Sequence, residues 1–305
     1  MEGSMMEKTR VGTASWTDKT LIKSGTFYPK PVNTAEGRLR FYAEHFNTVE
    51  VDSTYYALPA ERNAVLWAQR TPPGFVFHIK AYSMLTGHPT LIQGIPKVLK
   101  GELPKEILSR TQAKAFPKEI LEAAFDMFAS ALMPLQAAGK LGCLLFQFPP
   151  WLVPSSEAYA WLELVREKLP QHDLAVEFRH RRWITAPAYE TSLKFLKNLD
   201  ISYVILDGPW IKGWEGPAGV TADVAYIRFH GRNRENWFKK GGETAERYRY
   251  LYKEEELKKW TEKAKRVCKQ SGKAFAIFNN CYQDHGIRNA LQFISLLKPE
   301  GEAKD

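Results

Sequence analysis

The sequence predicts an α/β fold, a single TIM-type barrel in which eight parallel strands alternate with helices. Two patterns along the chain support this class. First, apolar runs of strand length alternate with amphipathic runs of helix length, an order typical of a parallel sheet. Second, the predicted strands have one apolar face and finish in polar or ionisable residues. Strands of an open doubly wound sheet are apolar on both faces, so closure into a barrel is favoured.

The segment 173–179 shows the strand pattern most clearly. Because side chains alternate along a strand, Ala175, Glu177 and Arg179 share one face and apolar residues share the other. In a barrel, such an inward face becomes functional at the carboxyl end of the strand. A structural ion pair between Glu177 and Arg179 is the alternative interpretation. The other predicted strands are 10–16, 48–53, 75–80, 141–148, 201–207, 223–230 and 273–279.

Helical periodicity and capping residues place helices between these strands. The predicted helices span 35–45, 61–70, 117–138, 155–169, 187–198, 253–271 and 284–298. We expect a long loop insertion after strand three, at 81–118, which contains short helices near 105–111, forms a lid and brings His88 near Lys80. After strand six the connecting helix is expected to be reduced or missing. The barrel is expected over residues 9–299, between a flexible N-terminal tail (1–8) and a C-terminal tail (300–305).

The composition limits the class of protein. Lys and Arg exceed Asp and Glu by nine charges, and the pI is near 9.3. This balance favours an acidic partner, such as nucleic acid or a phosphorylated metabolite, although solubility alone also explains it. The three cysteines have no close spacing, so neither a disulfide framework nor a cysteine-zinc site is indicated. Without a signal peptide or an apolar run of membrane length, we expect a cytoplasmic protein with no membrane partner.

Several nucleotide and hydrolase motifs are absent from the sequence. It contains no Walker A sequence, no glycine-rich dinucleotide fingerprint after the first strand, no zincin motif and no nucleophile elbow. P-loop nucleotide triphosphatases, dinucleotide enzymes, zincins and α/β-hydrolases therefore lose support.

Short motifs spread along nearly the whole chain identify a resemblance. The chain resembles the YecE-like family, a domain of unknown function whose fold is similar to that of endonuclease IV. This resemblance implies a TIM-type barrel; it implies no established activity, and fold analogy alone is weak support for nucleic-acid binding. The motifs that carry it are Val11-Gly-Thr-Ala-Ser-Trp16, Phe27-Tyr-Pro29, Val49-Glu-Val-Asp-Ser-Thr-Tyr-Tyr56, Phe77-His-Ile-Lys80, Leu144-Leu-Phe-Gln-Phe-Pro-Pro150, Ala175-Val-Glu-Phe-Arg179, Arg228-Phe-His-Gly-Arg232 and Phe278-Asn-Asn280.

Two positions depart from the family pattern. The family usually has Ser-Gly-Trp where this chain has Ala14-Ser15-Trp16, and it usually has Asn where this chain has Asp52. The second change adds a negative charge, and so a further oxygen ligand for a metal, at the predicted functional pole.

Polar residues at the strand ends form the predicted site. Glu50, Glu177 and His230 are the catalytic candidates, with the two glutamates as an acid-base pair. A satisfied network of ion pairs, such as Lys80 with Glu50, is the structural alternative. The substrate-binding candidates are Lys80, Gln147, Arg179, Asp207, Arg232, Asn279 and Asn280.

Two further groups of residues suggest ligands. One set of carboxylates and imidazole suits a divalent metal as cofactor: Glu50, Asp52, Glu177, Asp207 and His230. The other set is a basic rim with interleaved tryptophans, which suits phosphates and stacked bases. The rim residues are Arg179, His180, Arg181, Arg182, Trp183, Arg228, Arg232, Arg234, Trp237, Lys239 and Lys240.

The leading functional prediction is a hydrolase acting on a phosphate-bearing substrate, such as a nucleic acid or nucleotide, at the C-terminal mouth of the barrel. One alternative is a non-catalytic nucleic-acid-binding protein that uses the same rim. The other is a metal-dependent sugar isomerase or lyase.

Overall fold

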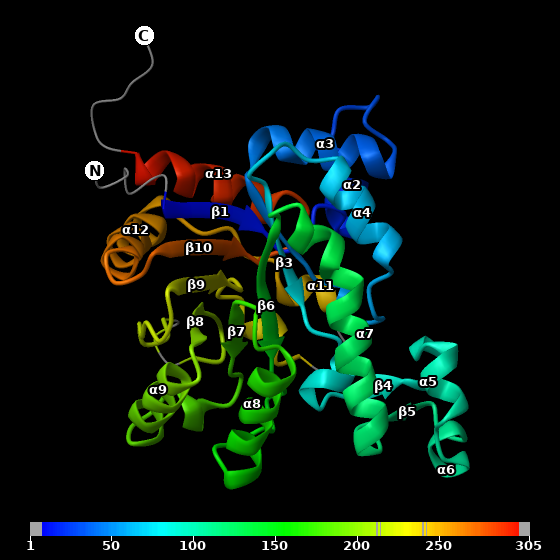
Figure 1. The fold of residues 1–305 in the computed structure, drawn as a ribbon. Coiled ribbons are helices and arrows are strands. Elements are labelled where there is room, and N and C mark those ends of the chain that lie inside the picture. Colours follow the sequence, from blue (N-terminus) through cyan, green and yellow to red (C-terminus); the bar gives the residue numbers. More distant parts are fainter. Residues whose placement is uncertain (1–7, 212, 214, 240, 242, 299–305) are drawn as a thin grey trace. The chain divides into compact units, whose positions relative to one another are not determined.

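The computed structural model describes residues 8–211, 213, 215–239, 241 and 243–298. The chain has the predicted α/β fold of a TIM-type barrel, with eight parallel strands in the sheet order β1-β10-β9-β8-β7-β6-β3-β2 (Figure 1). The strands are β1 (Thr9–Thr13), β2 (Thr48–Val51), β3 (Val76–Lys80), β6 (Leu141–Gln147), β7 (Leu174–Glu177), β8 (Ile201–Asp207), β9 (Val224–Phe229) and β10 (Lys273–Phe278). The chain divides into two compact units, residues 1–50 with 202–305 and residues 51–201, and each is described by itself.

The first unit holds five of the strands. β1 pairs with β10, β10 with β9, and β9 with β8, all in parallel, and a parallel bridge between Ala14 and Glu50 joins β1 to β2. The rings of Phe229 and Phe278 stack 4.4 Å apart in its core, and Trp260 meets Phe229 edge-on. Its helices are α2 (Lys19–Ser24), α3 (Ala35–His45), α10 (Arg234–Trp237), α11 (Thr244–Arg247), α12 (Glu254–Cys268) and α13 (His285–Leu297).

The second unit holds β3, β6 and β7, which pair in parallel in that order. The helix α7 (Lys118–Ala137) packs against β6, and its buried residues recur at helical spacing, among them Ile120, Ala124, Phe128 and Leu132. The helix α4 packs against α7, and α7 packs against α8. The helices outside the insertion are η1 (Ser53–Tyr55), α4 (Glu61–Gln69), α7 (Lys118–Ala137), α8 (Ser156–Lys168), η4 (Arg181–Trp183) and α9 (Ala188–Asn198).

The insertion at 81–118 consists of short elements, including a helix that begins at Lys105, where a short helix was predicted. Its two short strands pair in antiparallel fashion, and Pro96 and Pro104 each occupy the N-cap of a short helix. Two-residue strands carry no alternating pattern, so periodicity could not reveal them. Its elements are η2 (Ser83–Thr86), β4 (Thr90–Leu91), η3 (Ile92–Gly94), α5 (Lys97–Gly101), α6 (Lys105–Leu108) and β5 (Gln112–Ala113). Its role as a lid stays a prediction.

Several predicted boundaries shift in the structure. The first strand ends at Thr13 and not at Trp16, because Ser15 has a left-handed backbone with φ 71°. The strand through Glu177 ends at that residue, so Arg179 lies beyond it. Between β8 and β9, the described residues of 208–223 contain no helix. The predicted tails, apart from Lys8, lie outside the described residues. Within the described part of the chain, no helix has the length and apolar character needed to cross a membrane.

Candidate functional site

Three predicted site residues end neighbouring strands of the second unit. Lys80, Gln147 and Glu177 are the last residues of β3, β6 and β7, and parallel strands finish at one edge of a sheet. Arg179 joins two of them: its Nε donates to Glu177 Oε1, and its Nη2 donates to Gln147 Oε1 at 2.9 Å. The alternative of an ion pair between Glu177 and Arg179 is therefore confirmed. This pairing also holds the guanidinium in a fixed orientation.

Aromatic rings and further cations adjoin these strand ends. The Lys80 Nζ atom lies 4.6 Å from the centre of the Tyr55 ring, and the His88 ring lies 5.2 Å from the same ring. The insertion therefore brings His88 near Lys80, as predicted. His88 also meets the half-exposed Trp151 ring at 5.8 Å, and Lys114 Nζ lies 4.5 Å from that ring. These five residues together with Arg179 are called the Lys80 cluster below.

The Lys80 cluster has a positive electrostatic field. Burial, followed by the charges of Lys80 and Arg179, lowers the pKa of His88 to about 4. Burial and the neighbouring Tyr56 raise the pKa of Tyr55 to about 12, and the charge of Arg179 acts in the opposite direction. His88 is consequently neutral at pH 7. Its Nδ1 lies 2.8 Å from Thr86 Oγ1, whose hydroxyl donates to Ser83 O, so Nδ1 carries the proton and Nε2 is an acceptor.

Glu50, a catalytic candidate, is part of a buried polar group in the first unit. Arg228 Nη2 donates to its Oε1 at 2.6 Å, and the Tyr226 hydroxyl donates to its Oε2 at 2.9 Å. The side chains of Glu50 and Arg228 are 0% and 1% exposed. Arg228 therefore does not belong to an exposed basic rim, which corrects that prediction. The sequence could have indicated its burial, because Arg228 lies inside the predicted alternating strand 223–230 and not in the loop that follows it.

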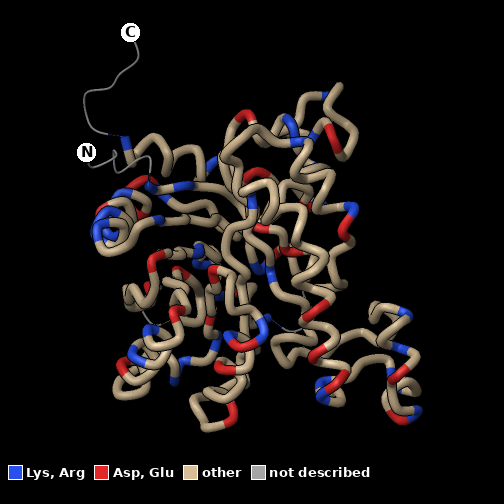
Figure 2. The backbone as a smooth tube through the Cα atoms, viewed as in Figure 1, with Lys and Arg blue, Asp and Glu red and all other residues tan. Residues whose placement is uncertain are grey.

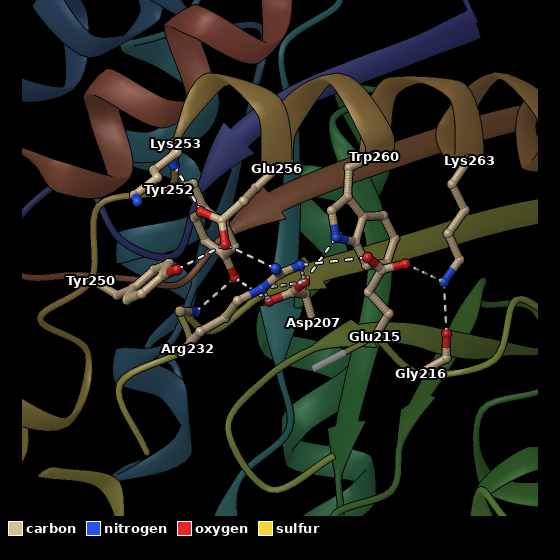
Figure 3. A network of polar contacts seen from close by, with 11 residues as sticks. Asp207, Glu215, Gly216, Arg232, Tyr250, Tyr252, Lys253, Glu256, Trp260 and Lys263 are labelled. Atoms are coloured by element: carbon tan, nitrogen blue, oxygen red, sulfur yellow. Dashed lines mark hydrogen bonds and ion pairs between the residues drawn. The ribbon is translucent and has the colours of Figure 1, made fainter. Parts of the chain in front are cut away.

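Asp207 and Arg232, both predicted to bind substrate, form the centre of a second network (Figure 3). The guanidinium of Arg232 donates to both Asp207 oxygens, from Nε at 3.1 Å and from Nη2 at 2.5 Å. Tyr252 and Trp260 donate to the same carboxylate at 2.6 and 2.8 Å. The other Arg232 nitrogen, Nη1, donates to Glu256 at 2.8 Å. These partners make the pair a structural tie to α12, so the geometry does not support phosphate binding by Arg232.

The protonation states in this network follow from its partners. Burial acts to lower the pKa of Arg232, but the hydrogen bonds and charge of Asp207 outweigh it, so the pKa lies above its ordinary value. Burial raises the pKa of Asp207 above its ordinary value, although the donors from Arg232, Tyr252 and Trp260 act to lower it. At the far end of the network, Lys263 Nζ donates to Gly216 O at 2.7 Å and lies 3.9 Å from Glu215 (Figure 3).

His230 and the two amides after β10 have different surroundings. The buried His230 ring accepts a hydrogen bond at Nδ1 from Asn279 Nδ2 (2.9 Å), and its ring centre lies 4.9 Å from that of Trp210. Asn279 is half-buried, whereas Asn280 is fully buried. The Asn280 amide donates to Tyr250 O and to Asn289 Oδ1, each at 2.9 Å. Asn280 therefore holds the chain near α13, and the geometry does not support it as a substrate ligand.

A model of the family described as "Protein of unknown function DUF72" matches residues 10–305. The chain belongs to the DUF72 family. The UPF0759 protein YunF of Bacillus subtilis (strain 168) is 32% identical over 296 residues, 95% of each chain. A DUF72 crystal structure from Thermotoga maritima MSB8 aligns with a TM-score of 0.73 and 33% identity, over 95% of this chain and 99% of that one. Another DUF72 crystal structure, from Enterococcus faecalis V583, aligns with a TM-score of 0.76 and 26% identity, over 96% of this chain and 97% of that one. The resemblance predicted from the motifs is confirmed.

The backbone at Ser15 has a conformation that favours glycine, the residue that the resemblance led us to expect there. Its φ of 71° lies in the left-handed region. Its backbone N–H donates to Glu50 O at 2.7 Å, next to the bridge between Ala14 and Glu50. The left-handed turn thus ends β1 where it meets β2.

The predicted basic rim is only partly exposed in this DUF72 chain. Trp183 is fully buried and stacks on Phe178 with ring centres 4.0 Å apart, so it is a core residue and cannot stack on bases. Lys240 lies outside the described residues. Figure 2 shows Lys and Arg interspersed with Asp and Glu along most of the chain. The exposed rim residues among those described are Arg181, Arg182, Arg234 and Lys239.

The metal prediction has no cluster to support it. Among the residues that the structure describes, no group of three or more His, Cys, Asp and Glu side chains is placed to hold a metal ion. The oxygens of Glu50 and Asp207 accept hydrogen bonds from arginine and tyrosine instead.

Sequence reasoning missed three residues of the Lys80 cluster. Tyr55 and Trp151 follow β2 and β6 by four residues each, and Lys114 lies at the end of the insertion. The loops after barrel strands carry functional residues, so Tyr55 and Trp151 had a usable positional signal. Lys114 had none.

Proposed function

We propose that this protein binds a phosphate-bearing ligand with a planar ring, such as a nucleotide or the end of a nucleic-acid strand, at the Lys80 cluster. The observation that carries the proposal is the meeting of Lys80, Arg179 and Lys114 with the rings of Tyr55, His88 and Trp151. Lysine and arginine are the phosphate-binding side chains of proteins. An exposed aromatic face stacks on a base without requiring a particular sequence.

The neutral state of His88 supports an anionic ligand. Burial lowers its pKa most and the two cations lower it further; a phosphate bound between the cations would offset their contribution. The neutral Nε2 of His88 accepts a hydrogen bond, which suits a ribose hydroxyl or a base amino group. The ligand therefore combines a phosphate for the cations with a sugar or base for the rings.

Calorimetric titration with adenosine monophosphate, ribose 5-phosphate and adenosine tests this function. We expect saturable binding of the two phosphates, and a loss of about tenfold or more in affinity for both in Lys80→Met, because a charge-assisted hydrogen bond is removed. Trp151→Ala should weaken only the nucleotide, by about 1–3 kcal/mol, because base stacking is lost. Lys105→Met, at an exposed position of α6, is the matched control. Absence of binding, or equal affinities in Lys80→Met and the control, would contradict the proposal.

We also propose that the bound phosphate ester is hydrolysed. The observation that favours it is the Glu177 carboxylate, which is wholly buried at the end of β7 and bonded to the same Arg179. As the water oxygen bonds to phosphorus, a carboxylate beside a phosphate-binding cation can accept the proton of that water. The ester P–O bond then breaks, and the alcohol leaves with a proton returned from the carboxyl group or from solvent. Turnover of adenosine monophosphate or of a short oligonucleotide should be abolished in Glu177→Gln. Binding without turnover in the native protein would instead leave a non-catalytic binding protein.

A further inference from the structure

A cleft of about 440 Å³ opens in the first unit, between the segments 232–236 and 249–250. Three arginines line it, Arg232, Arg234 and Arg249, together with the side chains of Asn233 and Asn236. No residue of the Lys80 cluster contributes to this lining, so the cleft is formed by different side chains from those of the proposed function.

The two walls of the cleft are tied together by hydrogen bonds. Asn233 Nδ2 donates to Glu246 O and to Arg249 O, each at 3.0 Å, and Asn233 Oδ1 accepts from the backbone N–H of Asn236 at 3.2 Å. Behind them, Gly231 has a φ of 80°, and a Cβ atom there would lie 2.7 Å from Tyr250 Cβ. The close approach at Gly231 and the Asn233 bonds fix the width of the cleft before a ligand arrives, which reduces the entropic cost of binding.

Flat aromatic rings support the two outer arginines. The guanidinium of Arg249 lies 5.1 Å from the centre of the Tyr282 ring, and that of Arg234 lies 5.9 Å from the centre of the Phe238 ring. A guanidinium held over a ring in this way can still donate from its N–H groups to oxygen acceptors. Both arginines are exposed, so an ion from solution can reach them.

The charges around the cleft nearly balance. Arg232 donates to Asp207 and Glu256, so it forms part of the wall but contributes little net charge. Arg234 and Arg249 add two positive charges. The lining carboxylate Glu235 opposes them, and Glu246 lies 3.4 Å from Arg249. A ligand must therefore form directed bonds to the guanidinium groups, since net attraction alone is weak.

We propose that this cleft is a phosphate-binding site, in which Arg234 and Arg249 donate to the phosphate oxygens and the Asn236 side chain donates a further hydrogen bond. Phosphate fits because its oxygens match the paired N–H groups of a guanidinium, and two arginines on facing walls can each bind one edge of the group. The phosphate belongs either to a small phosphorylated molecule or to a nucleic-acid backbone.

Nitrogen-15 NMR with added sodium pyrophosphate tests the site. We expect saturable shifts of the Asn236 side-chain amide and of the Arg249 Nε–H signal. Because two charge-assisted contacts are lost, Arg234→Ala/Arg249→Ala should weaken this binding by about tenfold or more. The charge-matched control is Arg181→Ala/Arg182→Ala, which removes two exposed arginines of the second unit and should leave the shifts unchanged.

Two further measurements distinguish a nucleic-acid backbone from a small phosphorylated ligand, and binding in the cleft from binding at the Lys80 cluster. An oligothymidylate of about ten nucleotides that shifts the same signals identifies a nucleic-acid backbone. Shifts with pyrophosphate alone identify a small phosphorylated ligand. Lys80→Met should preserve all of these shifts, so failure of the proposed function leaves this result intact. Unchanged Asn236 and Arg249 signals with both probes, or equal losses in the two double variants, would overturn the proposal.

Discussion

Arg228 donates to Glu50 across 2.6 Å, and both side chains are removed from solvent. The two residues lie 178 positions apart in the sequence. A buried ion pair of this kind contributes little net stability compared with an apolar pair, yet it is costly to break, because the remaining charge has lost its solvent and its partner.

Removing one partner should therefore destabilise the protein strongly. We expect Arg228→Met to lower the free energy of unfolding by about 3–5 kcal/mol, measured by urea denaturation. Tyr226→Phe removes a hydrogen bond to the same carboxylate but no charge, so a loss of about 1.5–3 kcal/mol is expected. The double variant Glu50→Gln/Arg228→Met should recover part of the loss, because no charge stays unpaired. Equal losses in Arg228→Met and Tyr226→Phe would contradict the buried charge pair.

The left-handed backbone of Ser15 predicts an unusual order of stabilities. We expect Ser15→Gly to be more stable than Ser15→Ala by about 1 kcal/mol, because only the alanine retains a Cβ atom at a positive φ. Both variants lose the hydroxyl, which accepts from Thr17 N–H at 3.0 Å, so that loss cancels in the comparison. The same pair of changes at Ser109, where φ is −73°, should give the opposite order. Thermal denaturation of the four variants measures both differences.

His88 predicts a dependence of stability on acidity. Its folded-state pKa of about 4 lies below the ordinary value of 6.5, so the unfolded chain binds more protons between these values. The stability contributed by neutral His88 is present above pH 6.5 and is lost as the pH falls towards 4. Between pH 7 and pH 5 the native protein should lose about 1–2 kcal/mol more than His88→Gln, allowing for partial solvent screening. Other histidines are common to both proteins, so the difference isolates His88.

The same histidine reports on the ligand. If phosphate binds between Lys80 and Arg179, its negative charge offsets the two cations that lower the His88 pKa. Adenosine monophosphate should then raise the pKa of His88, as followed by NMR of the ring protons, whereas adenosine should leave it nearer to its value in the unliganded protein. An unchanged pKa at saturating nucleotide would place the phosphate elsewhere.

The sequence predicted the strand-end residues well, because the alternation of side chains that identifies a strand also shows which polar side chains lie at its end. Alternation along β7 and the residues ending β3, β6 and β8 identified Lys80, Gln147, Glu177 and Asp207 as strand-end side chains. It could not show which charges meet, because partners such as Asp207 and Arg232 are joined by folding and not by spacing. The charge pattern therefore predicted that Arg232 binds phosphate. In the structure, its N–H groups donate to the carboxylates of Asp207 and Glu256 instead.

Tyr252 connects two parts of the Asp207 network, and its removal should be measurable. Its hydroxyl donates to Asp207 Oδ1 at 2.6 Å (Figure 3). The same hydroxyl accepts from the backbone N–H of Gly231 at 2.9 Å. Burial, with the charge of Asp207, raises the pKa of Tyr252 well above its ordinary value, so the hydroxyl stays protonated and keeps its role as donor.

We expect Tyr252→Phe to lower the free energy of unfolding by about 1.5–3 kcal/mol, since a hydrogen bond to a buried charged group is lost and the Gly231 N–H loses its acceptor. Tyr250→Phe is the matched control, because its hydroxyl donates to the partly exposed Glu256 at 2.8 Å. The control should cost less, as water can replace the lost donor at a partly exposed carboxylate. Urea denaturation of both variants measures the difference. Equal costs would mean that the Asp207 carboxylate is satisfied by Arg232 and Trp260 without Tyr252.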